Sequence, residues 1–261
     1  MKYDLRTTLV IIALFFFSQI AGLFIVNKNI ETFGTAAFEP SGEEEKVIIS
    51  LPASIIILTV VFILLHKLGL KNILLLWYSL AFITTVFFSL SAFMQEIYAV
   101  TIATVLLIIK FCSKDEYIHN IAELFVYGGL TVVFLPLLTP KIMIILLILI
   151  SAYDIYSVFY SKHMIVLAKN QESLNIFSGL KVRVDDNVSM LGGGDMAFPL
   201  MFASVMLRDY GALHGLLIVY GAVIGLLTLI LLSKKNKFYP AMPLITAGCF
   251  FGYAASLISF F

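Results

Sequence analysis

Two aspartates lie inside apolar stretches of the sequence, where a carboxylate is unfavourable. Asp154 occurs in the run from Ser151 to Tyr156, and Asp195 directly follows three glycines. An ionisable group at membrane depth costs at least about 2.5–3.5 kcal/mol on insertion scales, so it indicates a functional site by default. Two such groups in adjacent apolar segments predict a carboxylate pair that shares one proton, because two facing carboxylates in a low dielectric do not both ionise readily.

Such a pair could activate water. The ionised member would act as general base toward a water molecule. The protonated member would polarise a scissile carbonyl and then help to protonate the leaving amine. The same two residues also fit a proton- or cation-coupled transporter, or a membrane scaffold in which they are hydrogen-bonded structural residues. Taken alone, the two aspartates leave these three functions open.

The composition indicates a membrane protein. The chain has 261 residues, of which 61% are hydrophobic and 13% are charged, whereas a soluble domain is about 25% charged. The net charge of +1 provides no basic face for a nucleic acid. Cys112 and Cys249 lie in or beside apolar segments, and we expect both to be small buried side chains rather than a disulfide.

Nine apolar segments have the length of membrane spans, which need about 20 apolar residues. We therefore predict an all-α polytopic membrane protein with nine transmembrane helices. The segments lie at 5–26, 47–65, 73–94, 97–112, 121–138, 142–162, 191–207, 213–232 and 240–261. The segment 191–207 begins with glycines, so its first turn could be irregular, which is tolerated at membrane depth only against protein or water.

The basic residues predict the orientation. Thirteen of the 17 Lys and Arg residues fall on the side of the N-terminus and the even-numbered loops. Because basic residues are concentrated on the cytoplasmic side, the N-terminus should be cytoplasmic and the C-terminus outside. The cytoplasmic set is Lys2, Arg6, Lys67, Lys71, Lys110, Lys114, Lys162, Lys169, Lys181, Arg183, Lys234, Lys235 and Lys237.

The chain then divides into three parts. Residues 1–162 carry the first six spans, residues 163–190 form a cytoplasmic loop, and residues 191–261 carry the last three spans. Within the loop, residues 180–185 alternate apolar and charged side chains with the period of a strand. This segment is either a strand that could pair with an extended peptide or an amphipathic loop on the membrane surface.

Both aspartates fall in the cytoplasmic half of the bilayer. Asp154 precedes Lys162, at the cytoplasmic end of its span, by eight residues, which corresponds to about 12 Å of depth. Asp195 lies four residues into the following span, at about 6 Å or deeper if the glycines are extended. The glycines also permit close backbone approach. We therefore expect the two carboxyls to face each other across a helix pair.

Three short motifs carry a resemblance. Tyr153-Asp154 in the sixth span resembles the YD motif of the presenilin and signal peptide peptidase family, and Gly192-Gly193-Gly194-Asp195 resembles its GxGD motif. Pro240-Ala241-Met242-Pro243 resembles the PAL motif that opens the ninth span of that family. The three motifs occur in the family's order, on the corresponding spans and on one side of the membrane.

The resemblance implies an intramembrane aspartyl protease with Asp154 and Asp195 as its catalytic dyad. Tyr153 would line the site, and the three glycines would shape the approach to Asp195. The segment from Pro240 to Pro243 would lie beside the dyad and help to place the substrate. Two prolines lack N–H donors and leave nearby carbonyls free, so an unwound start of that span could contact an extended peptide.

The chain departs from the family's patterns in places. Met242 replaces the leucine of PAL, a change of similar volume. Phe198-Pro199, shortly after Asp195, resembles the signal peptide peptidase branch of the family. The expected cytoplasmic N-terminus and Pro243, directly after the PAL-like residues, instead resemble presenilins. Because the loop 163–190 is short, the chain is most similar to a compact archaeal-type presenilin homologue. We expect one uncut chain in the plasma membrane of a microbe, acting on transmembrane substrates without accessory subunits.

Other catalytic chemistry finds no support in the sequence. The four histidines form no H-E-x-x-H motif, so a zinc protease is not indicated; they are His66, His119, His163 and His214. No G-x-S motif precedes a helix, so a serine-type membrane protease is not indicated either. Asp195 after the glycines would repel a phosphate group. The sequence therefore implies no metal and no cofactor.

Overall fold

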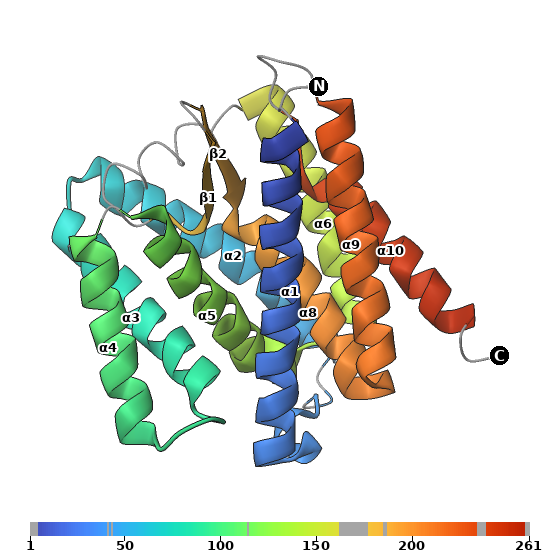
Figure 1. Cartoon of the computed structure of the whole chain (residues 1–261), viewed down its shortest axis with the longest axis horizontal. Coiled ribbons are helices and arrows are strands. Elements are labelled where there is room, and N and C mark those ends of the chain that lie inside the picture. Colours follow the sequence, from blue (N-terminus) through green and yellow to red (C-terminus); the bar gives the residue numbers. More distant parts are fainter. Residues whose placement is uncertain are drawn as a thin grey trace.

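The computed structural model describes residues 5–40, 42, 44–113, 115–161, 177–184, 187–233 and 239–258. Within these ranges the chain forms nine α-helices and one β-hairpin (Figure 1). The helices are α1 (Leu5–Phe33), α2 (Glu44–Lys67), α3 (Lys71–Leu90), α4 (Glu96–Cys112), α5 (Glu116–Phe134), α6 (Pro140–Tyr156), α8 (Gly193–Tyr210), α9 (Ala212–Leu232) and α10 (Met242–Ile258). Three short turns extend them: η1 (Thr35–Phe38), η2 (Leu135–Leu137) and the π-helical turn η3 (Ser157–Ser161).

Each of the nine segments expected to be spans contains a helix, and the predicted all-α class is confirmed. Six helices are long and apolar enough to cross a bilayer, namely α1, α2, α3, α5, α6 and α9. Of the other three, α4 and α10 have 17 residues each, at the lower limit for a span, and α8 carries charged residues near both ends. The chain is a multi-pass integral membrane protein. Its orientation in the membrane stays a prediction.

Several predicted boundaries differ from the helix ends, among them the end of the third span, expected at residue 94, whereas α3 ends at Leu90. The first span was expected to end at residue 26, but α1 continues to Phe33. Polar pairs on its surface support the extension, since Asn27 Nδ2 donates to Glu31 Oε1 over 2.6 Å. The seventh span was expected to begin at residue 191, but residues 191–192 end a strand and α8 begins at Gly193.

Helix α8 is the centre of the bundle. It packs against α1, α5, α6, α9 and α10, and every residue from Pro199 to Leu207 is buried. Asp195 stands at the start of this helix. A side chain on the first turn of the most enclosed helix is held by contacts on several sides, which is what a precise reactive geometry requires.

A second, smaller core joins α3, α4 and α5. Its buried residues are Phe82, Val86, Leu90, Ala99, Ala103, Leu107 and Ala122. Helix α5 also packs against α1 and α8. It therefore connects this second core to the main core around α8.

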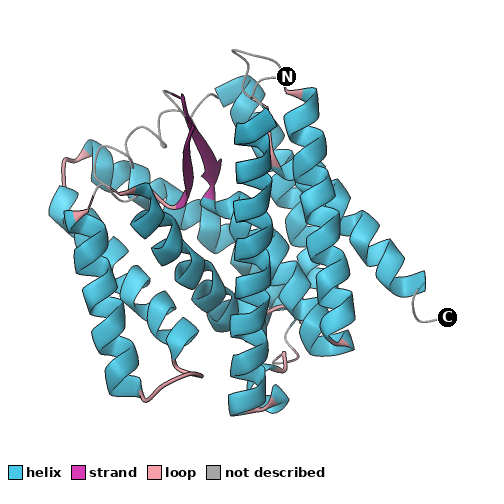
Figure 2. Ribbon diagram, in the orientation of Figure 1, coloured by secondary structure: helices cyan, strands magenta, loops and turns pink. Residues whose placement is uncertain are grey.

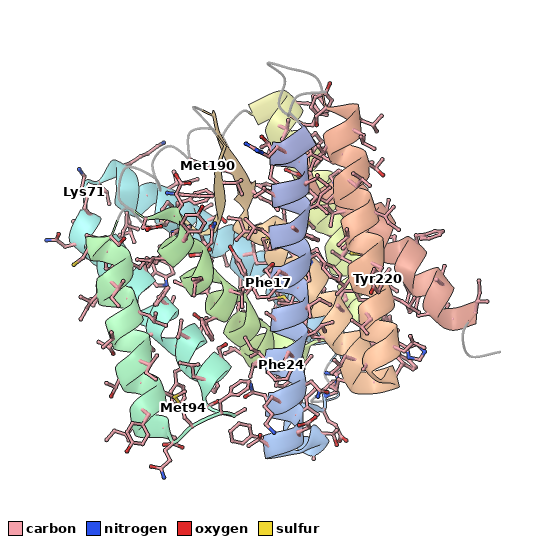
Figure 3. The ribbon with its side chains drawn as sticks, in the orientation of Figure 1. Phe17, Phe24, Lys71, Met94, Met190 and Tyr220 are labelled. Carbon is pink, nitrogen blue, oxygen red and sulfur yellow. The ribbon has the colours of Figure 1, made fainter. Side chains whose placement is uncertain are left out.

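The outer surface is apolar, as expected for a protein surrounded by lipid. Phe17 and Phe24 on α1 are each 62% exposed, and Tyr220 on α9 is 53% exposed (Figure 3). Helix α2 lies at the periphery, packs only against α3 and α6 among the described helices, and exposes Ile49 and Ile56. In water such a surface would drive aggregation, whereas in a bilayer it faces hydrocarbon.

Helices α9 and α10 approach each other closely through glycines. Gly221 and Gly225 on α9 face Gly248 and Gly252 on α10, in two small-xxx-small patterns. A Cβ on Gly221 would collide with the carbonyl oxygen of Gly248, and one on Gly248 would collide with that of Gly221. The contact fixes α10, and with it the start of α10, against the core.

The hairpin consists of β1 (Gly179–Val184) and β2 (Asn187–Gly192), paired antiparallel with Gly179 opposite Gly192. Strand β1 covers most of the alternating segment 180–185, so the strand interpretation of that segment is confirmed. The hairpin lies at the same end of the bundle as the start of α1 and the end of α6 (Figure 2). Strand β2 leads directly into α8 and Asp195.

Candidate active site

Asp154 lies on the last turn of α6 and is only 5% exposed. Its Oδ2 accepts a hydrogen bond of 3.0 Å from the backbone N–H of Met242. The backbone N–H of Ala241 also interacts with this carboxyl. Met242 is the first residue of α10, and the first N–H groups of a helix have no partner inside the helix. Asp154 therefore caps a helix that lies far from it in the sequence.

The segment before α10 is not helical. Tyr239, Pro240 and Ala241 precede the helix, and Pro243 is its second residue. Proline is well tolerated in the first turn, where its missing N–H would have no partner. The two prolines thus leave the N–H groups of Ala241 and Met242 as the donors that face Asp154.

Asp195 is the third residue of α8, whose N-cap is Gly192. The backbone N–H of Gly192 interacts with the Asp195 carboxyl. This is one half of a capping box, in which an acidic side chain at the third helical position reaches back to the N-cap N–H. A Cβ on Gly192 would lie 3.2 Å from Asp195 Oδ2. Gly192 therefore gives the carboxyl both a donor and space.

The two carboxyls lie close enough for their charges to repel. Helices α6, α8 and α10 pack against one another around them. Each carboxyl lies at a helix N-terminus, α10 for Asp154 and α8 for Asp195, and the helix dipole stabilises negative charge there. The arrangement favours a pair that carries one proton and one negative charge, which can perform general acid–base chemistry.

The remaining glycines of the motif have different surroundings. The Gly193 N–H donates to the carbonyl of Ser178 over 3.1 Å, and a Cβ on Gly193 would meet Ser178 Oγ at 3.0 Å. A Cβ on Gly194 would meet the Phe198 ring at 3.4 Å, an ordinary contact. Gly193 is thus fixed to the residue that precedes the hairpin, a contact that the sequence did not reveal.

Tyr153 has a different environment from its neighbour. Its side chain is 49% exposed, whereas Asp154 is buried. Adjacent residues on a helix point about 100° apart, which accounts for the difference. A contribution of Tyr153 to the lining of the site stays an expectation.

The sequence did not identify a buried polar cluster beside the hairpin. Lys110 on α4 forms an ion pair with Glu123 on α5, and their side chains are each 1% exposed. The sequence counts Lys110 among the basic residues of the cytoplasmic side, which stays a prediction; its side chain does not lie in a solvated loop but is buried against Glu123. In the sequence, the only sign of this cluster is Glu123, a carboxylate in the second turn of the apolar helix α5.

A buried amide also contacts the start of α8. Gln19 on α1 is 1% exposed, and its Nε2 donates to the carbonyl of Met196 over 2.9 Å. Within the described residues, no group of three or more His, Cys, Asp or Glu side chains could hold a metal ion. Cys112 and Cys249 are both free thiols, as expected, but only Cys249 is buried; the expected burial of Cys112 was wrong, because it lies exposed at the end of α4.

In this bundle of apolar helices, the buried Asp154 and the partly buried Asp195 lie at the N-termini of α10 and α8. Comparison with known proteins identifies the fold. The chain is similar to a solved structure of a presenilin family intramembrane aspartate protease in space group C222, with a TM-score of 0.73 and 18% identity over 97% of this chain and 99% of that chain. A structure of a presenilin family intramembrane aspartate protease in space group P2 gives a TM-score of 0.69 and 18% identity over 98% and 97%. No protein-family model and no curated protein sequence matches the chain.

The structural comparison confirms the predicted resemblance at the level of the fold. The alignment extends over nearly the whole of both chains, so no large domain is added or missing between them. At 18% identity the comparison establishes the architecture, and the chemistry of this chain must be argued from its own residues.

Proposed function

We propose that this protein is an intramembrane aspartyl protease that hydrolyses peptide bonds within transmembrane segments of membrane proteins. One observation carries the proposal: Asp154 on α6 bonds to the start of α10, where both helices pack against α8, which carries Asp195. Sequence motifs from three separate segments thus meet at one place, within the fold of presenilin family proteases.

In the proposed mechanism, one aspartate is ionised and takes a proton from water while the other is protonated. The protonated carboxyl donates a hydrogen bond to the scissile carbonyl, and the attacking water forms a tetrahedral intermediate. The proton is then transferred to the leaving amine. Which aspartate is ionised is a property of the coupled pair, so neither role is assigned to Asp154 or to Asp195 alone.

A substrate helix must unwind before it can be cut, because a helical carbonyl is hydrogen-bonded and shielded. The hairpin offers a place for the extended segment. Lys181 on β1 exchanges both backbone hydrogen bonds with Asn120 on α5. Its partner Met190 on β2 therefore directs its own N–H and C=O away from β1. Figure 3 places Met190 on the hairpin at the end of the bundle.

Strand β2 pairs with β1 alone among the described residues. A substrate strand could add to its open edge through backbone hydrogen bonds, next to the residues that lead to Asp195. Access from the lipid would be framed by α6 and α10, because both carry the motifs of the site. Crosslinking of a substrate photoprobe to α3 rather than to these helices would contradict that path.

The main alternative is a proton- or cation-coupled transporter that uses the same carboxylates. The architecture gives the transporter no support, since both solved structures compared above are of intramembrane proteases. A transporter also has no need for Met242 to bond to Asp154. A membrane scaffold has no need for two carboxyls that repel each other.

The test is cleavage of a single-span substrate by purified protein in a bilayer. The unmodified chain is compared with Asp154→Ala, Asp195→Ala and the control Glu31→Gln, which alters an exposed carboxylate on α1. Fragments that appear with the unmodified chain and the control, and vanish in both alanine variants, would support the proposal. Persistent cleavage in an alanine variant would indicate a contaminant. Absence of cleavage throughout, with ion flux in liposomes, would favour the transporter.

We further propose that the protein functions as a single uncut chain, without accessory subunits, in the plasma membrane of a microbe. The short segment 163–190 supports the single uncut chain, because it leaves no long loop between the two aspartates that would have to be cut. Activity of the purified chain alone in the cleavage assay would support it, and activity that requires added membrane extract would contradict it.

A further inference from the structure

One face of α5 holds the outer edge of β1 with side chains. His119 Nε2 lies 2.9 Å from the carbonyl oxygen of Gly179. Asn120 bonds both backbone groups of Lys181, at 2.7 and 2.9 Å. Glu123 Oε2 accepts the N–H of Gly179 over 3.3 Å. The backbone groups that β1 directs away from β2 at Gly179 and Lys181 are thus satisfied by α5, which substitutes for a neighbouring strand.

Glu123 makes the most connections in this cluster. Besides Gly179, its Oε2 accepts a hydrogen bond of 2.9 Å from Ser178 Oγ, and its Oε1 is paired with the Lys110 ammonium. Glu123 is 0% exposed and Lys110 is 4% exposed. A buried carboxylate requires both a counter-charge and hydrogen-bond donors, and the cluster supplies them.

Lys110 is itself well enclosed. Its ammonium donates to the hydroxyl of Tyr78 and lies over the rings of Tyr78 and Phe82, 5.2 and 5.1 Å from their centroids. Cation–π contacts stabilise a desolvated ammonium. The positive charge is therefore fixed in one place, where it pairs with the Glu123 carboxylate.

The cluster connects directly to the candidate active site. Ser178, which donates to Glu123, accepts the N–H of Gly193 through its carbonyl over 3.1 Å. Gly193 begins α8 and precedes Asp195 by two residues. Gly179, which also donates to Glu123, lies opposite Gly192 in the hairpin. Both residues that join Glu123 therefore contact the backbone immediately before Asp195.

Helix association alone does not explain this cluster. A buried ion pair can often be replaced by well-packed apolar residues without loss of stability, and apolar contacts already join α3, α4 and α5. What an apolar pair would lack is an acceptor for the Gly179 N–H and the Ser178 hydroxyl. The carboxylate is the group that fixes these donors in place.

We propose that Glu123, paired with Lys110, is a positioning residue of the active site: it fixes the start of the hairpin and thereby sets the backbone of Gly192 and Gly193 that places Asp195 opposite Asp154. The inference rests on the proposed function for its catalytic consequence. Glu123 acts through Ser178 and Gly179 and does not contact the dyad.

Two double variants test the proposal. Lys110→Met with Glu123→Gln removes both charges but keeps an acceptor oxygen. Lys110→Met with Glu123→Leu removes both charges and the acceptor, with a similar side-chain volume. Neither leaves an unpaired buried charge, so both should fold. Arg208→Met is the control, because Arg208 joins the carbonyls of Phe38 and Leu135 at the opposite end of α8.

The leucine variant should lower kcat by about tenfold or more relative to the glutamine variant, with KM changed less than about threefold, because misplacement by about 1 Å costs up to 10²-fold. Hydrogen exchange of the amides in 177–195 should be faster in the leucine variant only. Arg208→Met should lower the thermal midpoint without changing exchange in 177–195.

Equal kcat in the two double variants would overturn the positioning role, whatever the exchange shows. Equal exchange would overturn the anchoring of the hairpin by Glu123. Absence of cleavage by the unmodified protein would instead overturn the proposed function, and with it the catalytic part of this inference. Hydrogen exchange in 177–195 would still show whether Glu123 anchors the hairpin. Failure of the proposed function and failure of the anchoring are therefore distinguishable.

Discussion

Asp154 Oδ2 and the backbone N–H of Met242 form a hydrogen bond of 3.0 Å across 88 residues of sequence. The bond joins the end of α6 to the first residue of α10. The PAL-like segment 240–243 therefore contacts Asp154 through a backbone N–H, a contact that does not depend on the identity of the Met242 side chain. Its two prolines and this N–H together orient the carboxyl of Asp154.

The first prediction concerns that donor. Met242→Pro removes the N–H at a helical position that proline tolerates, whereas Met242→Leu keeps the N–H and nearly the same volume. Loss of a hydrogen bond to a charged group costs about 1.5–3 kcal/mol, so the proline variant should cleave about 10- to 100-fold more slowly. The leucine variant should remain near the unmodified rate. Equal rates of substrate cleavage for both variants would show that the bond does not matter.

The second prediction compares two glycines of the motif. Gly192→Ala would place a Cβ 3.2 Å from Asp195 Oδ2, while Gly194→Ala would place one 3.4 Å from the Phe198 ring. Gly192 has φ −64° and ψ 148°, which alanine adopts freely. The backbone is therefore not strained, and the effect should be on the carboxyl. We expect kcat to fall about tenfold for Gly192→Ala.

Gly194→Ala is the matched control for that comparison. It should change kcat by less than about threefold, because an ordinary contact needs no displacement of Asp195. The two variants should have similar thermal midpoints in detergent. A larger loss of kcat in Gly194→Ala than in Gly192→Ala would mean that the approach to the dyad, rather than the carboxyl, is the sensitive feature.

The sequence predicted those parts of the site whose signal is local. Asp154 and Asp195 are carboxylates in apolar surroundings, and their positions near one end of adjacent spans follow from helix rise alone. The helical class followed from the length of the apolar segments. The sequence did not decide the structure of 180–185, since an alternating segment can form a strand or lie on a membrane surface. Its pairing with β2 and its contacts with α5 distinguish the two.

The parts that could not be predicted depend on contacts distant in sequence. Lys110 near the end of α4 is typical of a basic residue at the membrane interface, and its burial depends on Glu123 from the next helix. Ser178 and Gln19 carry no motif, and they matter only because they bond to Gly193 and Met196. No periodicity encodes such pairs, because each requires the folded bundle.

The third prediction concerns the contact between α9 and α10. Gly248→Ala would drive a methyl group into the carbonyl of Gly221, and overpacking of this kind costs about 1–3 kcal/mol. The displacement of α10 should also weaken the bond between Met242 and Asp154, so cleavage should fall with stability. Ala254→Val, at an exposed position on the same helix, is the control and should change neither the thermal midpoint nor cleavage.

The fourth prediction tests orientation with the natural thiols. Cys112 is exposed at the end of α4, whereas Cys249 is buried. The end of α4 leads into the start of α5, where Asn120 holds the hairpin, so Cys112 lies at the same end of the bundle as the hairpin. If the N-terminus is cytoplasmic, this whole end is cytoplasmic. A membrane-impermeant maleimide should then label inside-out vesicles and leave intact cells unlabelled.

Cys112→Ser is the control for this labelling, and it should abolish the signal because Cys249 is inaccessible. Labelling of intact cells would place the hairpin and both aspartates on the outer side of the membrane, which is the opposite of the predicted orientation. The chemistry of the dyad would be unchanged by that result, since the helix N-termini that face Asp154 and Asp195 belong to the fold. Only the side from which water and the cleaved fragments exchange would differ.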